Sequence, residues 1–192
     1  MSSPRDTEGQ RFTSAAGRLL IATPLLLDPN FYRTVVYVVE HSEEGALGVV
    51  LNRPTEEAVI DHLPDWTDWL SDPPFGFVGG PVANEVAVGV VEKPGLLPES
   101  WDPTPDDVGL VDLSEGPDGL GSVASARVYS GYAGWVAGQL EMELRTGSWI
   151  VVEGGLADVF TTDPEALWRK VLKRQPDRRS LYASFPDDPA SN

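Results

Sequence analysis

Residues 40–45, Glu-His-Ser-Glu-Glu-Gly, bring together groups that could serve acid–base or metal chemistry. Imidazole and carboxylate are common ligands of divalent metals and common general acids and bases. Helical metal motifs need ligands one turn apart, which this segment lacks, and His62 is the only other histidine. Residues 42–45 match a four-residue turn in which Gly45 takes a positive φ. We therefore predict a hairpin turn with His41 at a strand end, and we assign no metal ligand and no catalytic residue.

This hairpin would bring two arginines together. Antiparallel pairing across the turn makes opposite residue numbers sum to about 87, which places Arg33 opposite a residue near Pro54 and therefore beside Arg53. Two guanidinium groups repel each other unless an anion lies between them. Nearby acidic side chains could supply it as an internal salt-bridge network: Asp28, Glu56 and Glu57. The alternative is an external phosphate or carboxylate ligand, which we would expect at Asn52-Arg53-Pro54.

Two further stretches are candidates for ligand contact. The consecutive glycines Gly79 and Gly80 could present backbone N–H groups to an anion, although a tight turn also explains them. They match neither a dinucleotide-binding fingerprint nor a P-loop. Trp135 and Gln139, read as one helical turn apart, could line a pocket or simply pack in the core. The candidate anion or ligand surface is thus Arg33, Asn52, Arg53, Gly79, Gly80, Trp135 and Gln139.

The elements that must position these residues are mostly strands. Short β-branched runs that are apolar on both alternating faces predict interior strands over 34–40 and 46–51, with further strands over 86–92, 108–113, 126–130 and 148–153. Helices are predicted over 55–63, 131–147 and 162–174. Strands and helices do not alternate regularly, which favours an α+β fold over a doubly wound parallel sheet.

One domain suffices for a chain of 192 residues. Residues 1–16 and 186–192 have the composition of flexible tails, and residues 17–185 form the predicted single domain. Within it, the acidic, Pro- and Gly-rich stretch 93–121 is predicted to be a surface excursion, which serves either as a solvated loop or as a partner-binding surface.

The charge balance excludes several classes of partner. With 30 acidic residues against 14 Lys and Arg, the net charge is −16, which opposes direct binding to nucleic acid or to anionic membranes. The chain has no cysteine, so thiol catalysis and disulfides are absent. The early apolar run over 19–27 is too short to span a bilayer, and the N-terminus lacks the apolar core of a signal peptide. We expect a soluble cytoplasmic protein.

Several of these stretches also resemble a known family. The blocks GRLLIATPLLLDPNFYRTVVYVVEHSEEGALGVVLNRPT, FVGGPV and YSGYAGWVAGQLEMELRTGSWIVV, with the helix around Trp168, are similar to the bacterial YqgE/AlgH family from about residue 17 to residue 168. The resemblance implies a bifurcated, mostly antiparallel sheet folded into a pseudo-barrel with a few flanking helices. It implies little about activity, because the family is largely uncharacterised and carries only a transcriptional-regulator label.

The resemblance offers no established catalytic residue and no cofactor. The leading hypothesis is therefore a non-catalytic regulatory or accessory protein that acts through a protein or small-molecule partner. The alternative is an enzyme or sensor for an anionic small molecule, with the arginine pair and the Gly79-Gly80-Pro81 backbone as its binding site. Direct regulation of transcription would require duplex binding, which the acidity and the lack of a recognisable helix-turn-helix oppose.

Overall fold

The computed structural model describes residues 13–92, 108–113, 116–120 and 123–186, and it confirms the α+β class. The strands are β1 (Arg18–Ala22), β2 (Val35–Ser42), β3 (Gly45–Val50), β4 (Pro54–Ala58), β5 (Phe75–Val78), β6 (Val82–Glu92), β7 (Val108–Asp112), β8 (Ser125–Val136) and β9 (Trp149–Glu153). The α-helices are α1 (Gln139–Arg145), α2 (Leu156–Val159) and α3 (Leu167–Lys173). Short 3-10 helices are η1 (Val59–Asp61), η2 (Pro64–Trp69), η4 (Pro117–Leu120) and η5 (Arg178–Ser184).

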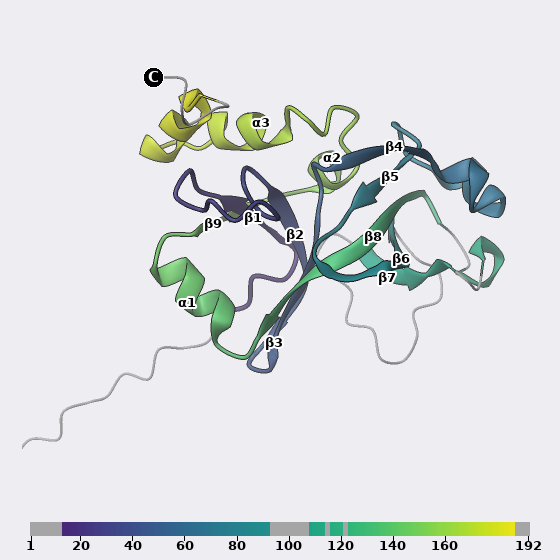
Figure 1. Cartoon of the computed structure of the whole chain (residues 1–192), viewed down its shortest axis with the longest axis horizontal. Coiled ribbons are helices and arrows are strands. Elements are labelled where there is room, and N and C mark those ends of the chain that lie inside the picture. Colours follow the sequence, from purple (N-terminus) through teal and green to yellow (C-terminus); the bar gives the residue numbers. More distant parts are fainter. Residues whose placement is uncertain (1–12, 93–107, 114–115, 121–122, 187–192) are drawn as a thin grey trace, which may run out of the picture.

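The long strand β8 is where the sheet forks (Figure 1). Its last residues pair with β3, and from there the sheet continues through β2 and β1 to β9. Its earlier residues pair with β6, which carries β7, and with β5, which carries β4. The β5–β8 pair is parallel, whereas the other named strand pairs are antiparallel. The sheet is therefore mixed, bifurcated and not closed into a barrel.

Strands β1 and β2 are buried on both faces, which the sequence predicts for residues 34–40, whereas β1 is not predicted as a strand. In β1, Leu19 and Ile21 join one hydrophobic cluster, whereas Leu20 and Ala22 join another on the opposite face. Helix α3 covers the first face and α1 packs against the second, and Figure 1 shows them on opposite sides of β1 and β9. Each face of an interior strand thus buries apolar area, which at roughly 25 cal/mol per Å² is the main stabilisation of this half of the molecule.

A third cluster lies under η2 at the other branch of the fork. Trp66 of η2 is buried there and donates from its indole nitrogen to the carbonyl of Leu113. Strand β8 contributes to all three clusters: Ala126 and Val128 to this one, Tyr129 to the first, and Ala133 and Trp135 to the second. The fork therefore rests on one strand that joins the three cores.

The β2–β3 hairpin confirms the turn predicted at residues 42–45. Ser42 pairs with Gly45, whose φ of 142° is positive as expected. The predicted sum holds for three pairs, and then a bulge between Val38 and Glu40 shifts the register by one residue. A β-bulge adds an unpaired residue to one strand, which sequence alternation does not reveal.

The predicted helix over 55–63 is wrong. Residues 54–58 form the edge strand β4, and only 59–61 turn, as η1. The backbone N–H of Val59 donates to the carbonyl of Pro74, so pairing with the β5 segment takes the hydrogen bonds that a helix would use. Tertiary pairing has overridden a short amphipathic pattern here.

The predicted helix over 131–147 is correct only in its second half. Residues up to Val136 belong to β8, and Gly138, with a φ of 75°, separates the strand from α1. Ala133 and Trp135 are buried whereas Gly134 is exposed, so the small residues follow strand alternation rather than a helical stripe. Trp135 and Gln139 are consequently not one helical turn apart. The third predicted helix, over 162–174, is confirmed by α3.

The described structure begins within the predicted N-terminal tail. Residues 1–12 of that tail lie outside the described residues, whereas Ala15 is buried against the domain. In the acidic stretch 93–121, residues 108–112 form β7, and residues 93–107 lie outside the described part, as does the end of the chain from 187.

Candidate functional site

Asn52 joins the two arginine-bearing segments. Its side-chain N–H donates to the carbonyl of Arg33 at 2.9 Å, and its Oδ1 accepts the backbone N–H of Val35 at 2.9 Å. The two segments lie side by side, as the hairpin argument predicts. The side-chain amide of Asn52 thus hydrogen-bonds the backbone of the loop that leads into β2.

Arg33 is directed toward the C-terminal part of the domain. Its φ of 56° lies in the left-handed region, where non-glycine residues are uncommon. The guanidinium carbon lies 4.7 Å from the centre of the Trp168 ring, and Nη2 donates to the carbonyls of Phe185 and Pro186. Arg33 thus ties its loop to α3 and to the segment that follows η5.

Arg53 takes a different set of partners. Its Nη2 donates to the carbonyl of Tyr32 at 2.8 Å and to that of Pro29 at 3.3 Å. Within the described residues it forms no ion pair, so Asp28, Glu56 and Glu57 do not neutralise it. The two arginines share neighbouring backbone segments, but their guanidinium groups have different partners.

Arg53 is one wall of a cleft of about 390 Å³. The cleft is lined by Pro29, Asn30, Val50, Arg53, Pro54, Val78, Gly80 and Pro81. Its two polar side chains are those of Asn30 and Arg53, and the Asn30 backbone is fixed by a 2.8 Å hydrogen bond from its N–H to Oδ1 of Asp28. A guanidinium beside an amide suits a carboxylate or phosphate. Among the described residues that line the cleft there is no nucleophile and no general base, and the guanidinium offers hydrogen-bond donors to an anion.

The glycine pair is explained by a close approach to β8. A side chain at Gly79 would place its Cβ 2.2 Å from the carbonyl oxygen of Gly131, and one at Gly80 would lie 2.3 Å from that of Tyr132. The N–H of Gly79 already donates to the carbonyl of Ser130. That donor is therefore used within the sheet, and Gly80 alone of the pair lines the cleft.

Trp135 and Gln139 lie at another place, where α1 meets the sheet. The indole nitrogens of Trp135 and Trp149 both donate to Oε2 of Glu143, at 2.9 and 2.7 Å, and Nε2 of Gln139 donates to its Oε1 at 2.9 Å. Phe31 packs against both indoles. Trp135 also borders a shallow hollow at the hairpin mouth, away from the Arg53 cleft. The residues of the predicted ligand surface therefore lie in separate places. Of these residues, Arg53 and Gly80 line the cleft.

Sequence reasoning missed Glu143, and it missed the buried pair Arg127 and Tyr129 in β8. Burial lowers the pKa of the Arg127 guanidinium and raises the pKa of Tyr129 to about 12. Arg127 lies near enough to oppose the shift of Tyr129, yet the phenol oxygen has no hydrogen-bond partner of normal geometry. The signal in the sequence was a charged residue in the otherwise apolar run of 126–129.

His41 is held as a structural residue. The backbone N–H of Ala15 donates to its Nδ1 at 2.9 Å, so the ring proton lies on Nε2 and is donated to Oε1 of Glu141 at 2.9 Å. In the part of the chain that the structure describes, no three His, Asp or Glu side chains gather as a metal site. No helix of that part is long and apolar enough to cross a bilayer.

Comparison with known proteins places this arrangement in a family. The model of a family described as AlgH-like matches residues 19–179. The chain belongs to the AlgH-like family. It is 48% identical over 186 residues to a UPF0301 protein of Streptomyces coelicolor, with 94% of this chain and 96% of that protein covered. It is 42% identical over 182 residues to a UPF0301 protein of Mycobacterium tuberculosis, covering 92% and 90% of the two chains.

Solved structures agree with the AlgH-like assignment. The crystal structure of a Corynebacterium diphtheriae protein matches with a TM-score of 0.78 at 30% identity, covering 92% of this chain and 95% of the other. The solution structure of the AlgH protein from Pseudomonas aeruginosa matches with a TM-score of 0.65 at 28% identity, covering 98% and 100%. The resemblance recognised in the sequence is thus confirmed. The names of these AlgH-like relatives state no reaction, so any function must be argued from the cleft itself.

Proposed function

We propose that this AlgH-like protein is a non-catalytic regulatory or accessory protein of the cytoplasm, whose partner or ligand presents an anionic group to the Arg53 cleft. The observation that carries the proposal is a guanidinium that lines a cleft without an ion-pair partner among the described residues. Unlike the buried Arg127, this guanidinium borders an open cleft.

The chemistry of the lining supports binding rather than turnover. General acid–base and nucleophilic catalysis need a titratable or nucleophilic side chain within hydrogen-bond reach of the reacting group. The cleft instead offers one guanidinium, one amide, three prolines and two valines. Carbonyls of Pro29 and Tyr32 hold the Arg53 side chain in place, so less side-chain entropy is lost when an anion binds.

The apolar part of the cleft suggests the shape of the ligand. Val78 is 46% exposed beside Arg53, and Val82, just past the cleft, is 37% exposed. A carboxylate or phosphate attached to a short apolar group would contact both kinds of surface. A peptide segment that carries an acidic side chain and a small metabolite that carries a carboxylate both fit this description.

The acidity of the chain argues against a nucleic-acid partner. Nucleic-acid affinity comes largely from many neutralised phosphates, and a single arginine in a strongly acidic protein offers too few cations. Regulation would then run through a protein or small molecule. A fluorescence-anisotropy titration with duplex DNA at low salt is expected to stay flat.

Ligand-induced stabilisation tests the proposal. Thermal unfolding is measured with inorganic phosphate, acetate and succinate at millimolar concentration, for the natural protein and for Arg53→Gln. Binding to the native state raises the midpoint, and the variant should lose that rise. Arg179→Gln removes one exposed arginine elsewhere and serves as the control. The absence of any rise with the natural protein, or an equal rise with Arg53→Gln, would refute the proposal.

A second function, an enzyme or sensor for an anionic small molecule, would use the same cleft. The Arg53 guanidinium, which has no ion-pair partner among the described residues, also favours this second function. Only measurement of catalytic turnover distinguishes it from the non-catalytic role proposed above. The test is a broad screen for hydrolase and transferase activity. If the natural protein is active and Arg53→Ala is inactive, the cleft is a catalytic site and the protein is an enzyme.

A further inference from the structure

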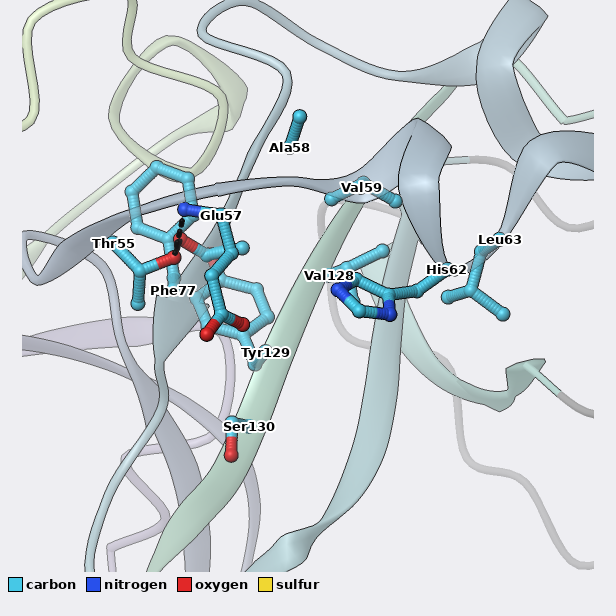
Figure 2. Close-up of a pocket in the computed structure, with 11 residues that line it drawn as sticks. Thr55, Glu57, Ala58, Val59, His62, Leu63, Phe77, Val128, Tyr129 and Ser130 are labelled. Atoms are coloured by element: carbon cyan, nitrogen blue, oxygen red, sulfur yellow. Dashed lines mark hydrogen bonds between the residues drawn. The ribbon is translucent and has the colours of Figure 1, made fainter.

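A second cavity, of about 300 Å³, lies where β4, η1 and β5 pack against β8. Its walls are mostly apolar, and they come from β4, η1, β5 and β8 (Figure 2). Val59, Leu63 and Val128 belong to the cluster under η2, whereas Phe77 and Tyr129 belong to the main core. The cavity is therefore the seam between two hydrophobic clusters. Its size is at the lower end of small-molecule sites and suits a ligand with about one ring.

The inner wall of this cavity shields a buried cation. The Phe77 and Tyr129 rings lie 5.6 Å apart, and the guanidinium carbon of Arg127 lies 4.6 Å from the Phe77 ring centre. Arg127 is only 1% exposed. It donates to the carbonyls of Asp72, Val159 and Thr161, at 2.7 to 3.0 Å. Its charge is held by the backbone and is not presented to a ligand.

Of the titratable side chains among the described residues that line the cavity, Glu57, His62 and Tyr129, the carboxylate of Glu57 is the one that is charged in its ordinary state at neutral pH. Glu57 of β4 is exposed, and in the described structure it forms no ion pair. Figure 2 shows Glu57 and His62 on opposite sides, with Tyr129 and Val128 between them. The hydroxyl of Thr55 is already used, because it donates to the carbonyl of Gly76 and accepts the N–H of Glu57. No Arg or Lys is among the described residues that line the cavity.

These observations select one class of ligand. An apolar cavity with an unpaired carboxylate at its mouth, in a protein of net charge −16, attracts a cation and repels an anion. We propose that the cavity binds a small amine: an aromatic or apolar body between Val59, Val128 and Phe77, and an ammonium group hydrogen-bonded to Glu57. This site is independent of the Arg53 cleft, which has the opposite charge preference.

The expected energetics are modest and distinctive. Burying one ring supplies most of the affinity, at roughly 25 cal/mol per Å² of apolar area. An exposed ion pair adds about 0.2 to 1 kcal/mol, which corresponds to roughly a 1.5- to 5-fold preference for the amine over an uncharged analogue. The charge therefore determines the ranking of similar ligands more than it determines whether they bind.

Three probes of the same shape test this ranking: phenethylamine, phenethyl alcohol and phenylpropionate. Binding is followed by NMR chemical-shift changes of the backbone amides. We expect shifts at residues 55–63 and 128–130, with the amine tightest and the carboxylate weakest. An equal or tighter affinity for the carboxylate would overturn the proposal, as would the absence of shifts at these residues with millimolar amine.

Substitutions of Glu57, at the mouth of the cavity, test whether its charge determines which ligand binds tightest. Glu57→Gln should weaken amine binding roughly 1.5- to 5-fold and leave the alcohol unchanged. Glu57→Lys should invert the preference between the amine and the carboxylate. Glu56→Gln and Glu56→Lys are matched controls, because Glu56 is also exposed, carries the same charge and does not line the cavity. If the Glu56 and Glu57 variants behave alike, general electrostatics explains the preference and the site is refuted.

Discussion

Arg127 and Arg53 present the same side chain in two opposite situations. Both donate to backbone carbonyls, and neither forms an ion pair within the described residues. Arg127 is buried in β8 and uses its terminal nitrogens on three carbonyls, whereas Arg53 is half-buried and uses one nitrogen beside an open cleft.

The difference shows that burial and access to an open cleft, rather than the missing carboxylate, separate a structural arginine from a binding one. Arg127 satisfies both terminal nitrogens inside the protein, because desolvation without hydrogen bonds is costly, and only its buried Nε has no hydrogen-bond partner among the described residues. A half-buried guanidinium keeps donors that water or a ligand can take. Substitutions at or near the buried Arg127 and the half-buried Arg53 test this difference.

Replacing Arg127 should have the largest effect. Arg127→Met leaves three carbonyls, of Asp72 in one segment and of Val159 and Thr161 in another, without their donor, and each buried unsatisfied group costs about 1 to 3 kcal/mol. We expect a loss of about 3 to 5 kcal/mol in the free energy of unfolding, measured by urea denaturation. Arg127→Lys should recover little of it, because an ammonium lacks the planar fork that reaches several acceptors.

The exposed Arg145 provides the control for this prediction. Among the described residues its guanidinium hydrogen-bonds only the sulfur of Met142, so Arg145→Met should change the stability by less than about 0.5 kcal/mol. Equal stability losses for the two variants would mean that Arg127 does not tie the segments together.

The glycine pair beside the cleft should also be intolerant of change. Gly79→Ala would place a Cβ 2.2 Å from the backbone oxygen of Gly131, which can move only if β8 moves. Overpacking of this kind costs about 1 to 3 kcal/mol. Gly76→Ala, three residues earlier, in β5, is the control, because its nearest new contact is the Thr55 hydroxyl of β4 at 3.4 Å. A thermal-unfolding midpoint equal in the two variants would show that the close approach is not a constraint.

The buried Tyr129, beside Arg127, should make the free energy of unfolding depend on pH. Burial raises its pKa from 10.0 to about 12, so the folded state retains the phenol proton where the unfolded state has lost it. Stability from this group is therefore fully present below pH 10 and is lost as pH rises toward 12, by up to about 2 to 3 kcal/mol. Tyr129→Phe should remove that slope. At neutral pH it should cost little, because its hydroxyl has no hydrogen-bond partner to lose.

The half-buried Tyr132 gives the comparison that isolates this effect. Urea denaturation between pH 9 and 12 is carried out on the natural protein, Tyr129→Phe and Tyr132→Phe, in steps of about one pH unit. If Tyr129→Phe and the natural protein lose stability in parallel over this range, other groups account for the slope.

Much of the fold was predictable because it rests on local patterns. Runs that are apolar on both faces gave the interior strands β2 and β3, and a serine, two glutamates and a glycine gave their turn. The helices over 55–63 and 131–136 were predicted wrongly because pairing with β5 and β3 determines those segments, and the partner strands are distant in sequence.

The candidate site was predictable only where one hairpin determines it. The turn placed residues 32–33 beside 52–53, and the structure agrees. The direction of each guanidinium depends on Trp168 and on the loop around Pro29, which no pairing rule relates to the hairpin. The amine cavity combines residues 55–63 and 76–77 with residues 128–130, so it could not be seen before the parallel pairing of β5 with β8 was known.

Replacing Arg53 should have the smallest effect on stability and the clearest effect on binding. Arg53→Gln removes one half-buried donor from the carbonyls of Pro29 and Tyr32, which costs at most about 1 kcal/mol because water can take its place. Urea denaturation without added anion measures this term. The same variant should lose all of the phosphate- or succinate-induced stabilisation, whereas Arg33→Gln should retain it, because Arg33 faces Trp168 and the segment after η5. A large loss of stability in Arg53→Gln would mean that Arg53, like Arg127, is a structural residue. The binding proposal would then lose its basis, which is the difference between a structural and a ligand-binding arginine.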